Sequence, residues 1–182
     1  MSDPHRAPWT ISAGVLTAVA GAALVVGSQL GDVPLAVSGG AFIGAAVLEL
    51  VTGVSLRRFG AVWMPQVFAG VVGLAFGLCL LALLAFDGRA LTAAPAALIL
   101  GVFCVTNALF RGLDLLVEQP PALFSEVTDV VVTFALGAAM FAVWREATPA
   151  MLAVVVGTEL VAGGACITAS ARAVLHPEYV HH

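Results

Sequence analysis

The sequence predicts an all-α polytopic membrane protein with six transmembrane helices arranged as three repeated helical hairpins. Two observations on composition support this class: the 182 residues are 61% hydrophobic, and only 10% of them are charged. A water-soluble domain carries about 25% charged residues, so this chain has too few for a surface that faces water. As a third observation, the hydrophobic residues form continuous runs instead of alternating with polar ones, which favours helices over a transmembrane barrel.

The hydrophobic runs are long enough for six spans, because a helix of about 20 residues crosses the roughly 30 Å hydrocarbon core of a bilayer. The first run is long for the hydrophobic part of a signal peptide, so we interpret it as a retained span. We expect one six-helix bundle over residues 1–182 without separable domains, with spans at about 9–26, 33–56, 62–86, 91–113, 123–144 and 150–175.

Short connections follow the first, third and fifth spans, and they predict helical hairpins. These turns are 27–32, 87–89 and 145–149, whereas Arg57 and Arg58 end the second span and a connector from Asp114 to Pro121 follows the fourth. Glu49, Asn107 and Glu159 occupy similar places in the second helix of each predicted hairpin. The sequence Glu-Leu-Val-Thr-Gly from Glu49 also resembles Glu-Leu-Val-Ala-Gly from Glu159. A threefold hairpin repeat is the simplest explanation.

The distribution of arginine predicts the orientation, since cytoplasmic loops carry the excess of positive charge. With the N-terminus inside, only Arg89 and Arg145 lie in outer turns, and the other five arginines lie on the inner side, at positions 6, 57, 58, 111 and 172. We therefore expect both termini in the cytoplasm and the protein in the cytoplasmic membrane.

Small residues at four-residue spacing predict close helix packing in two of the spans. Gly40 and Gly44 form such a pair in the second span, and Gly73 and Gly77 form one in the third. Glycine lets helix backbones approach closely in a membrane. Packing inside the bundle and packing between protomers are both compatible with this pattern.

Five polar residues within the spans are the candidate site: Glu159, Asp129, Glu49, Arg111 and Asn107. An ionisable group at bilayer depth costs roughly 2.5 kcal/mol or more, so it should face protein instead of lipid. Arg111 is the cation at a depth similar to that of Asp129, and we expect these two to pair. Glu159 has no obvious cation nearby and is expected to be protonated at neutral pH. The same residues are read either as a proton-responsive or solute-conducting site, or as hydrogen-bonding groups that fix the helix register.

The remaining charged residues and histidines do not indicate a functional site. We interpret Glu126, Asp114 and Glu118 as solvated residues near the inner interface, and His176, His181 and His182 as part of a tail instead of a metal site. Catalytic motifs and phosphate-binding loops are missing from the sequence, and it holds no basic patch for nucleic acid. We expect no catalytic residue, no metal and no cofactor. The expected partners are the lipid bilayer and, through the glycine faces, a second copy or another membrane protein.

Several segments resemble the HdeD-type family of acid-resistance membrane proteins, which are small six-span bacterial proteins built from repeated hairpins. The resemblance covers the layout of all six spans and is most specific in the second half, at Gly101–Val105, Asp129, Ala147–Pro149 and Val156–Leu160. It implies a location in the cytoplasmic membrane and a role in survival of acid stress. It also implies no enzyme activity and no cofactor. Asp129 and Glu159 lie inside the matched segments, whereas Glu49 and Arg111 lie outside them.

Three hypotheses on function follow from these observations. The leading one is a non-enzymatic protein of the HdeD type that contributes to acid or envelope stress tolerance through proton-responsive carboxyl groups. The second is a small transporter or channel for protons or a small solute, although parallel hairpins differ from the inverted repeats of many secondary transporters. The third is an assembly subunit that binds another membrane protein through its glycine-rich faces.

Overall fold

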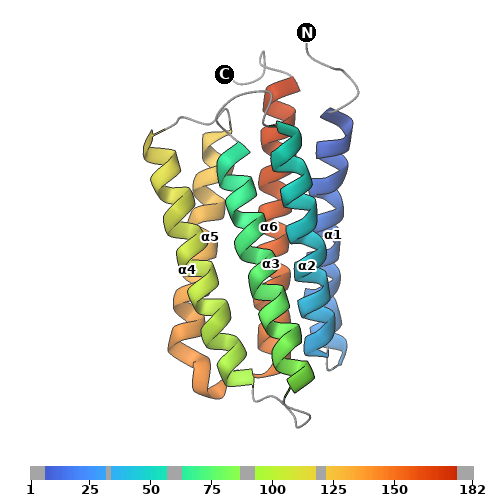
Figure 1. Cartoon of the computed structure of the whole chain (residues 1–182), viewed down its shortest axis with the longest axis vertical. Helices are drawn as coiled ribbons and strands as arrows, with labels where there is room; N and C mark the ends of the chain where they lie inside the picture. The colour runs from blue at the N-terminus through green and yellow to red at the C-terminus, as the bar shows by residue number, and fades with distance from the viewer. Residues whose placement is uncertain (1–6, 32–33, 57–62, 87–92, 118–121, 176–182) are drawn as a thin grey trace.

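Six α-helices make up almost all of the described structure, a computed structural model that describes residues 7–31, 34–56, 63–86, 93–117 and 122–175. The helices run side by side as a bundle, and α1 begins at the same end at which α6 finishes (Figure 1). We call this the upper end of the bundle. The helices are α1 (Ala7–Leu30), α2 (Leu35–Leu56), α3 (Trp63–Phe86), α4 (Ala93–Val117), α5 (Leu123–Val143) and α6 (Pro149–Leu175), and a 3-10 turn, η2 (Trp144–Glu146), follows α5.

The helices coincide with the six predicted spans, but two of them run further than predicted. Helix α1 continues through Leu30, so most of the predicted turn at 27–32 is helical. The hydroxyl of Ser28 donates to the carbonyl of Val25 at 2.7 Å, a bond that is compatible with helix and leaves no need for a turn at Gly27. Helix α4 likewise includes Asp114 and ends at Val117, whereas we predicted its end near Leu113.

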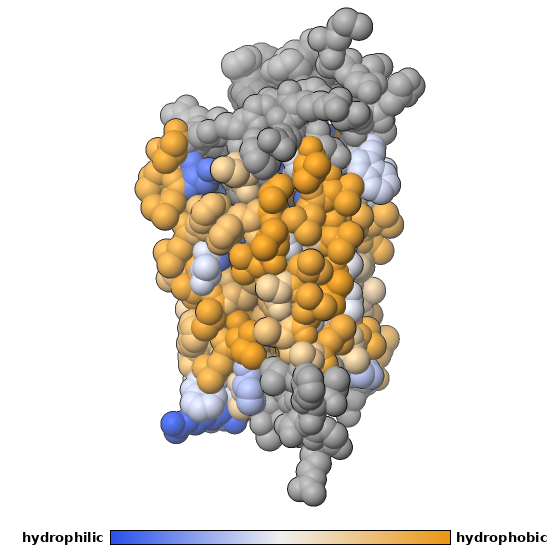
Figure 2. Space-filling view, in the orientation of Figure 1, coloured by the Kyte–Doolittle hydropathy of each residue, from blue (hydrophilic) through white to orange (hydrophobic). Residues whose placement is uncertain are grey.

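The length and composition of the helices indicate an integral membrane protein. Five helices contain a segment long and hydrophobic enough to cross a bilayer, and in α3 the hydrophobic segment found among the described residues is Gln66–Ala82. Valine, leucine and phenylalanine side chains are exposed along the outside of the bundle. In Figure 2 hydrophobic residues cover the middle of the visible face, and hydrophilic ones lie near its two ends. This is the distribution that a bilayer requires.

Helix pairing differs from the predicted hairpins in one respect. The most extensive contacts join α2 with α3, α4 with α5, and α1 with α6, while α1 with α2, α3 with α4 and α5 with α6 meet less extensively. Each even-numbered helix therefore packs most closely against the odd-numbered helix that follows it, and α6 closes the ring by packing against α1. Helix α6 also contacts both α2 and α4, the two other even-numbered helices.

Glycines allow α1 and α6 to approach each other with their backbones nearly in contact. A methyl group built on Gly164 of α6 would lie 2.5 Å from the backbone oxygen of Gly14 and 2.6 Å from the backbone nitrogen of Ala18. One built on Gly157 would lie 2.6 Å from the backbone oxygen of Gly21. Such distances are too short for any side chain, so this interface depends on glycine at these positions.

The predicted glycine pairs have different outcomes. Gly73 and Gly77 of α3 face α2, where Phe42, Ala46 and Ile43 surround them, so this pair packs inside the bundle as expected. Gly40 and Gly44 of α2 instead lie on the exposed face, with nothing within 4 Å of a methyl group built on either. Of the two alternatives that the sequence left open, packing within the bundle therefore does not apply to this pair. Their packing between protomers stays a prediction.

Candidate functional site

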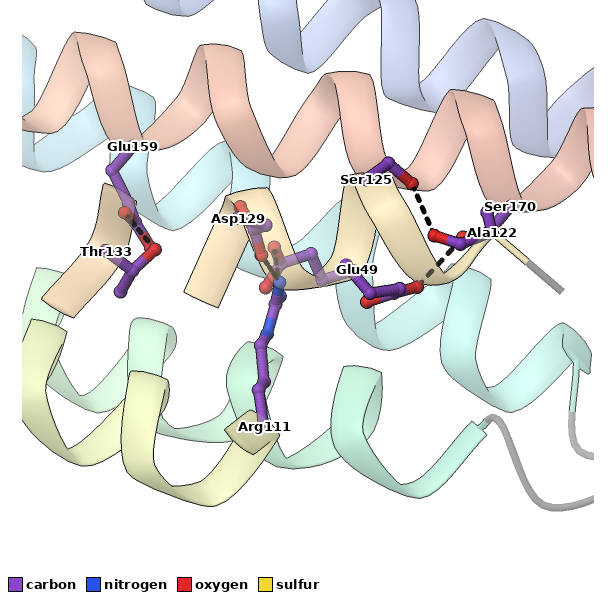
Figure 3. Close-up of polar contacts among 9 residues, drawn as sticks. Glu49, Arg111, Ala122, Ser125, Asp129, Thr133, Glu159 and Ser170 are labelled. Carbon is purple, nitrogen blue, oxygen red and sulfur yellow. Dashed lines mark hydrogen bonds and ion pairs between the residues drawn. The ribbon is translucent and has the colours of Figure 1, made fainter. Parts of the chain in front are cut away.

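An ion pair between two neighbouring helices forms the middle of the candidate site. Arg111 of α4 donates from Nη1 to Oδ2 of Asp129 on α5, which confirms the predicted pair. The second terminal nitrogen of Arg111 lies 3.7 Å from Oε1 of Glu49 on α2. Arg111 and Asp129 are 9% and 2% exposed, so water does little to stabilise these charges and they depend on one another. Figure 3 shows Arg111 extending from α4 towards Asp129 and Glu49.

Glu159 is held separately, by a hydroxyl group of α5. Thr133 donates its hydroxyl to Oε2 of Glu159 at 2.7 Å, and both residues are buried. Thr133 follows Asp129 by four residues, so one face of α5 carries the partners of both Arg111 and Glu159. We refer to Glu49, Arg111, Asp129, Thr133 and Glu159 as the polar cluster.

Glu126 continues the same face of α5 towards the upper end of the bundle. The hydroxyl of Ser170 on α6 donates to Oε1 of Glu126 at 2.9 Å, and Glu126 is half-buried. The interpretation of Glu126 as a solvated residue was therefore wrong, because it joins α5 to α6. Asp114 is also half-buried within α4, whereas Glu118 and the tail histidines lie outside the described residues.

A small cavity joins the remaining candidate residues. Its volume is about 20 Å³, and its polar lining comes from Thr17, Glu49, Asn107, Arg111 and Glu159. Three of these residues, Glu49, Asn107 and Glu159, for which the sequence predicted matching positions in three helices, thus line the same cavity. Asn107 is only 2% exposed, and its Oδ1 atom has no hydrogen-bond partner in the described part of the chain. The expectation that Asn107 hydrogen-bonds between helices is not met by this atom.

Aromatic rings close the cavity towards the lower end of the bundle. Phe42 and Phe103 line it, and both lie about two helical turns below Glu49 and Arg111 on their own helices. Their ring centroids are 4.9 Å apart in an edge-to-face arrangement, and Phe76 packs against both of them. Polar contacts therefore extend from Glu126 and Ser170 to Thr133 and Glu159. The hydrophobic layer of rings lies below them.

The charges of the polar cluster do not balance. The cluster contains three carboxyl groups and one guanidinium group, so ionisation of all three would leave two uncompensated negative charges. A buried charge without a partner is strongly destabilising, so such an arrangement favours binding of protons or of another positive charge. No group of three histidine, cysteine or acidic residues among the described residues is arranged to hold a metal ion.

The chain matches no family model and no curated protein, and its structure matches no solved structure.

Proposed function

We propose that this protein is a non-enzymatic membrane protein whose buried carboxyl groups take up and release protons, and that it contributes to tolerance of acid or envelope stress as an HdeD-type protein. The proposal places it in the cytoplasmic membrane, with both termini in the cytoplasm. The threefold repeat belongs to the same proposal, and the meeting of Glu49, Asn107 and Glu159 at one cavity supports it.

The observation that carries the proposal is the excess of buried acid. Glu159 is 8% exposed, and its one hydrogen-bond partner in the polar cluster, Thr133, is uncharged. Burial disfavours the charged form of a carboxyl group that has no cation of its own, so such a group readily binds a proton. Asp129 and Glu49 share Arg111, so a proton on either of them would leave the other better paired.

The position of the aromatic layer favours a response to protons over passage of a larger solute. Polar side chains lead from the upper end to Glu159, but the rings of Phe42, Phe76 and Phe103 lie beyond it. The cavity that Glu159 and Phe42 line has a volume of about 20 Å³, which is room for a single water molecule. These features support a site that protons enter and leave from one side.

Infrared spectroscopy of the protein in lipid provides the direct test. We expect a protonated carboxyl band of Glu159 that disappears in Glu159→Gln and whose intensity depends on pH between mildly acidic and neutral conditions. Thr133→Val, which removes only the hydroxyl donor, should move the same band to higher frequency without abolishing it. A spectrum in which no pH-dependent band is lost in Glu159→Gln would contradict the proposal.

A growth experiment tests the physiological part. Cells that lack the protein should survive acid shock less well, and a plasmid copy should restore survival. We expect Glu159→Gln and Asp129→Asn to restore it less than the unchanged protein does. Equal rescue by both variants would exclude a role for these carboxyl groups in stress tolerance.

A further inference from the structure

The cavity beside Glu159 contains an acceptor that no described group of the protein satisfies. The Oδ1 atom of Asn107 is buried without a hydrogen-bond partner among the described residues. Among the other polar lining residues, the hydroxyl proton of Thr17 is donated to the carbonyl of Ala13 at 3.0 Å. The terminal nitrogens of Arg111 point to Asp129 and Glu49. A donor inside the cavity would satisfy Oδ1 of Asn107.

The size and lining of the cavity specify what this donor is. A volume of about 20 Å³ exceeds the roughly 10–15 Å³ that a single water molecule needs, and a buried water needs two to four polar partners. Asn107, Glu49 and Glu159 supply acceptors, while Phe42, Phe103 and Leu160 supply the hydrophobic remainder of the lining. A water molecule both donates and accepts, so it satisfies the amide of Asn107 in either of its two orientations.

A glycine on α6 leaves the room for this molecule. Gly163 lines the cavity one helical turn after Glu159, and a methyl group built on it would lie 3.7 Å from Oε1 of Glu49. That distance is an ordinary contact, so alanine fits here without moving Glu49. It would, however, occupy the space next to the carboxyl group.

We propose that this cavity is a binding site for one water molecule, which donates one proton to Oδ1 of Asn107 and lies between the carboxyl groups of Glu159 and Glu49, where it donates its second proton to one of them and accepts from the other when that group is protonated. The bridge joins two parts of the polar cluster that have no direct contact: Glu159 with Thr133 on one side, and Glu49 with Arg111 and Asp129 on the other. Protons then pass between α6 and α2 through the water. This last step rests on the proposed function, whereas the water site itself does not.

The titratable groups that face the site come from three neighbouring helices. Glu49 on α2, Arg111 and Cys104 on α4, and Asp129 on α5 are near enough to influence Glu159 electrostatically. A single water that contacts both glutamates makes their protonation interdependent, because a proton gained by one changes the hydrogen bonds of the other.

The test uses an unusual property of the sequence: Asn107 is its only asparagine. Selective ¹⁵N labelling of the asparagine side chain therefore gives a single amide signal in the full-length protein in lipid bilayers. We expect magnetisation transfer from water protons to this amide by solid-state NMR. In Gly163→Ala the transfer should fall several-fold, because the added methyl group takes the place of the water.

Gly44→Ala is the matched control, since it makes the same substitution in a helix at an exposed position with nothing within 4 Å. It should leave the transfer unchanged. Absence of transfer in the unchanged protein, or equal transfer in Gly163→Ala, overturns the proposal. An amide signal that shifts when sodium is replaced by N-methylglucamine would place a cation in the cavity and overturn it as well.

The two proposals fail in different ways. A carboxyl band of Glu159 that depends on pH, together with no water transfer to Asn107, removes the water site and leaves the proposed function standing. Water transfer that is lost in Gly163→Ala, with no pH-dependent band, supports the water site and removes the proton-responsive function.

Discussion

Replacement of Arg111 with methionine is expected to destabilise the protein by about 3–5 kcal/mol, the usual effect of removing one partner from a buried ion pair. Methionine keeps much of the length of the side chain but leaves Asp129 and Glu49 without their cation. Asp129 is 2% exposed and its Oδ1 atom already has no partner, so it has no means of recovering solvation. Thermal or denaturant unfolding in detergent, followed by circular dichroism, measures the loss.

The double variant Arg111→Met/Asp129→Asn distinguishes lost charge pairing from lost packing. If the penalty comes from the unpaired carboxylate, the neutral asparagine should recover a large part of the stability that Arg111→Met loses. The single variant Asp129→Asn should be milder than Arg111→Met, because the cation would keep Glu49 at 3.7 Å. A change of less than 1 kcal/mol in Arg111→Met would show that the pair contributes little.

Replacement of Gly164 with alanine is expected to cost about 1–3 kcal/mol, as overpacking of a close interface does. The new methyl group would meet backbone atoms of Gly14 and Ala18, which cannot rotate away, so α1 must move from α6. Gly112→Ala is the control: its methyl group would make an ordinary contact with Val130 at 3.7 Å, and the higher helix propensity of alanine should leave stability unchanged or slightly increased. Equal melting temperatures for the two variants would contradict this account of the α1–α6 interface.

The helices and the central ion pair could be predicted because they depend on composition and depth alone. Long hydrophobic runs have few alternatives in a bilayer, and Arg111 was the cation at a depth similar to that of Asp129. The role of Thr133 as the donor to Glu159 could have been inferred as well, because it lies four residues after Asp129 on the same helix face.

The face of each helix that points inward could not be predicted so readily. Helix α2 contains Gly39 beside Gly40, and it is Gly39 that packs near Leu80 and Leu81 of α3 while Gly40 is exposed. Both faces of such a helix are hydrophobic, since one meets lipid and the other meets protein, so the pattern of hydrophobic residues does not distinguish them. The contact between α1 and α6 joins the two helices that lie furthest apart in the sequence, and no pattern within either segment predicts that they are partners.

The closure of the ring by α1 and α6 has a consequence for how the protein is made. Helix α1 leaves the ribosome before the other five helices, yet its most extensive interface is with α6, which is synthesised after them. Arg111 and Asp129 lie on consecutive helices and can pair in the lipid as soon as α5 is inserted. The glycine-lined face of α1 is covered only after α6 is inserted, and α6 also carries Glu159. The polar cluster is thus complete only after α6 is inserted, and a chain cut short before α6 would expose the glycine-lined face of α1 to membrane quality control.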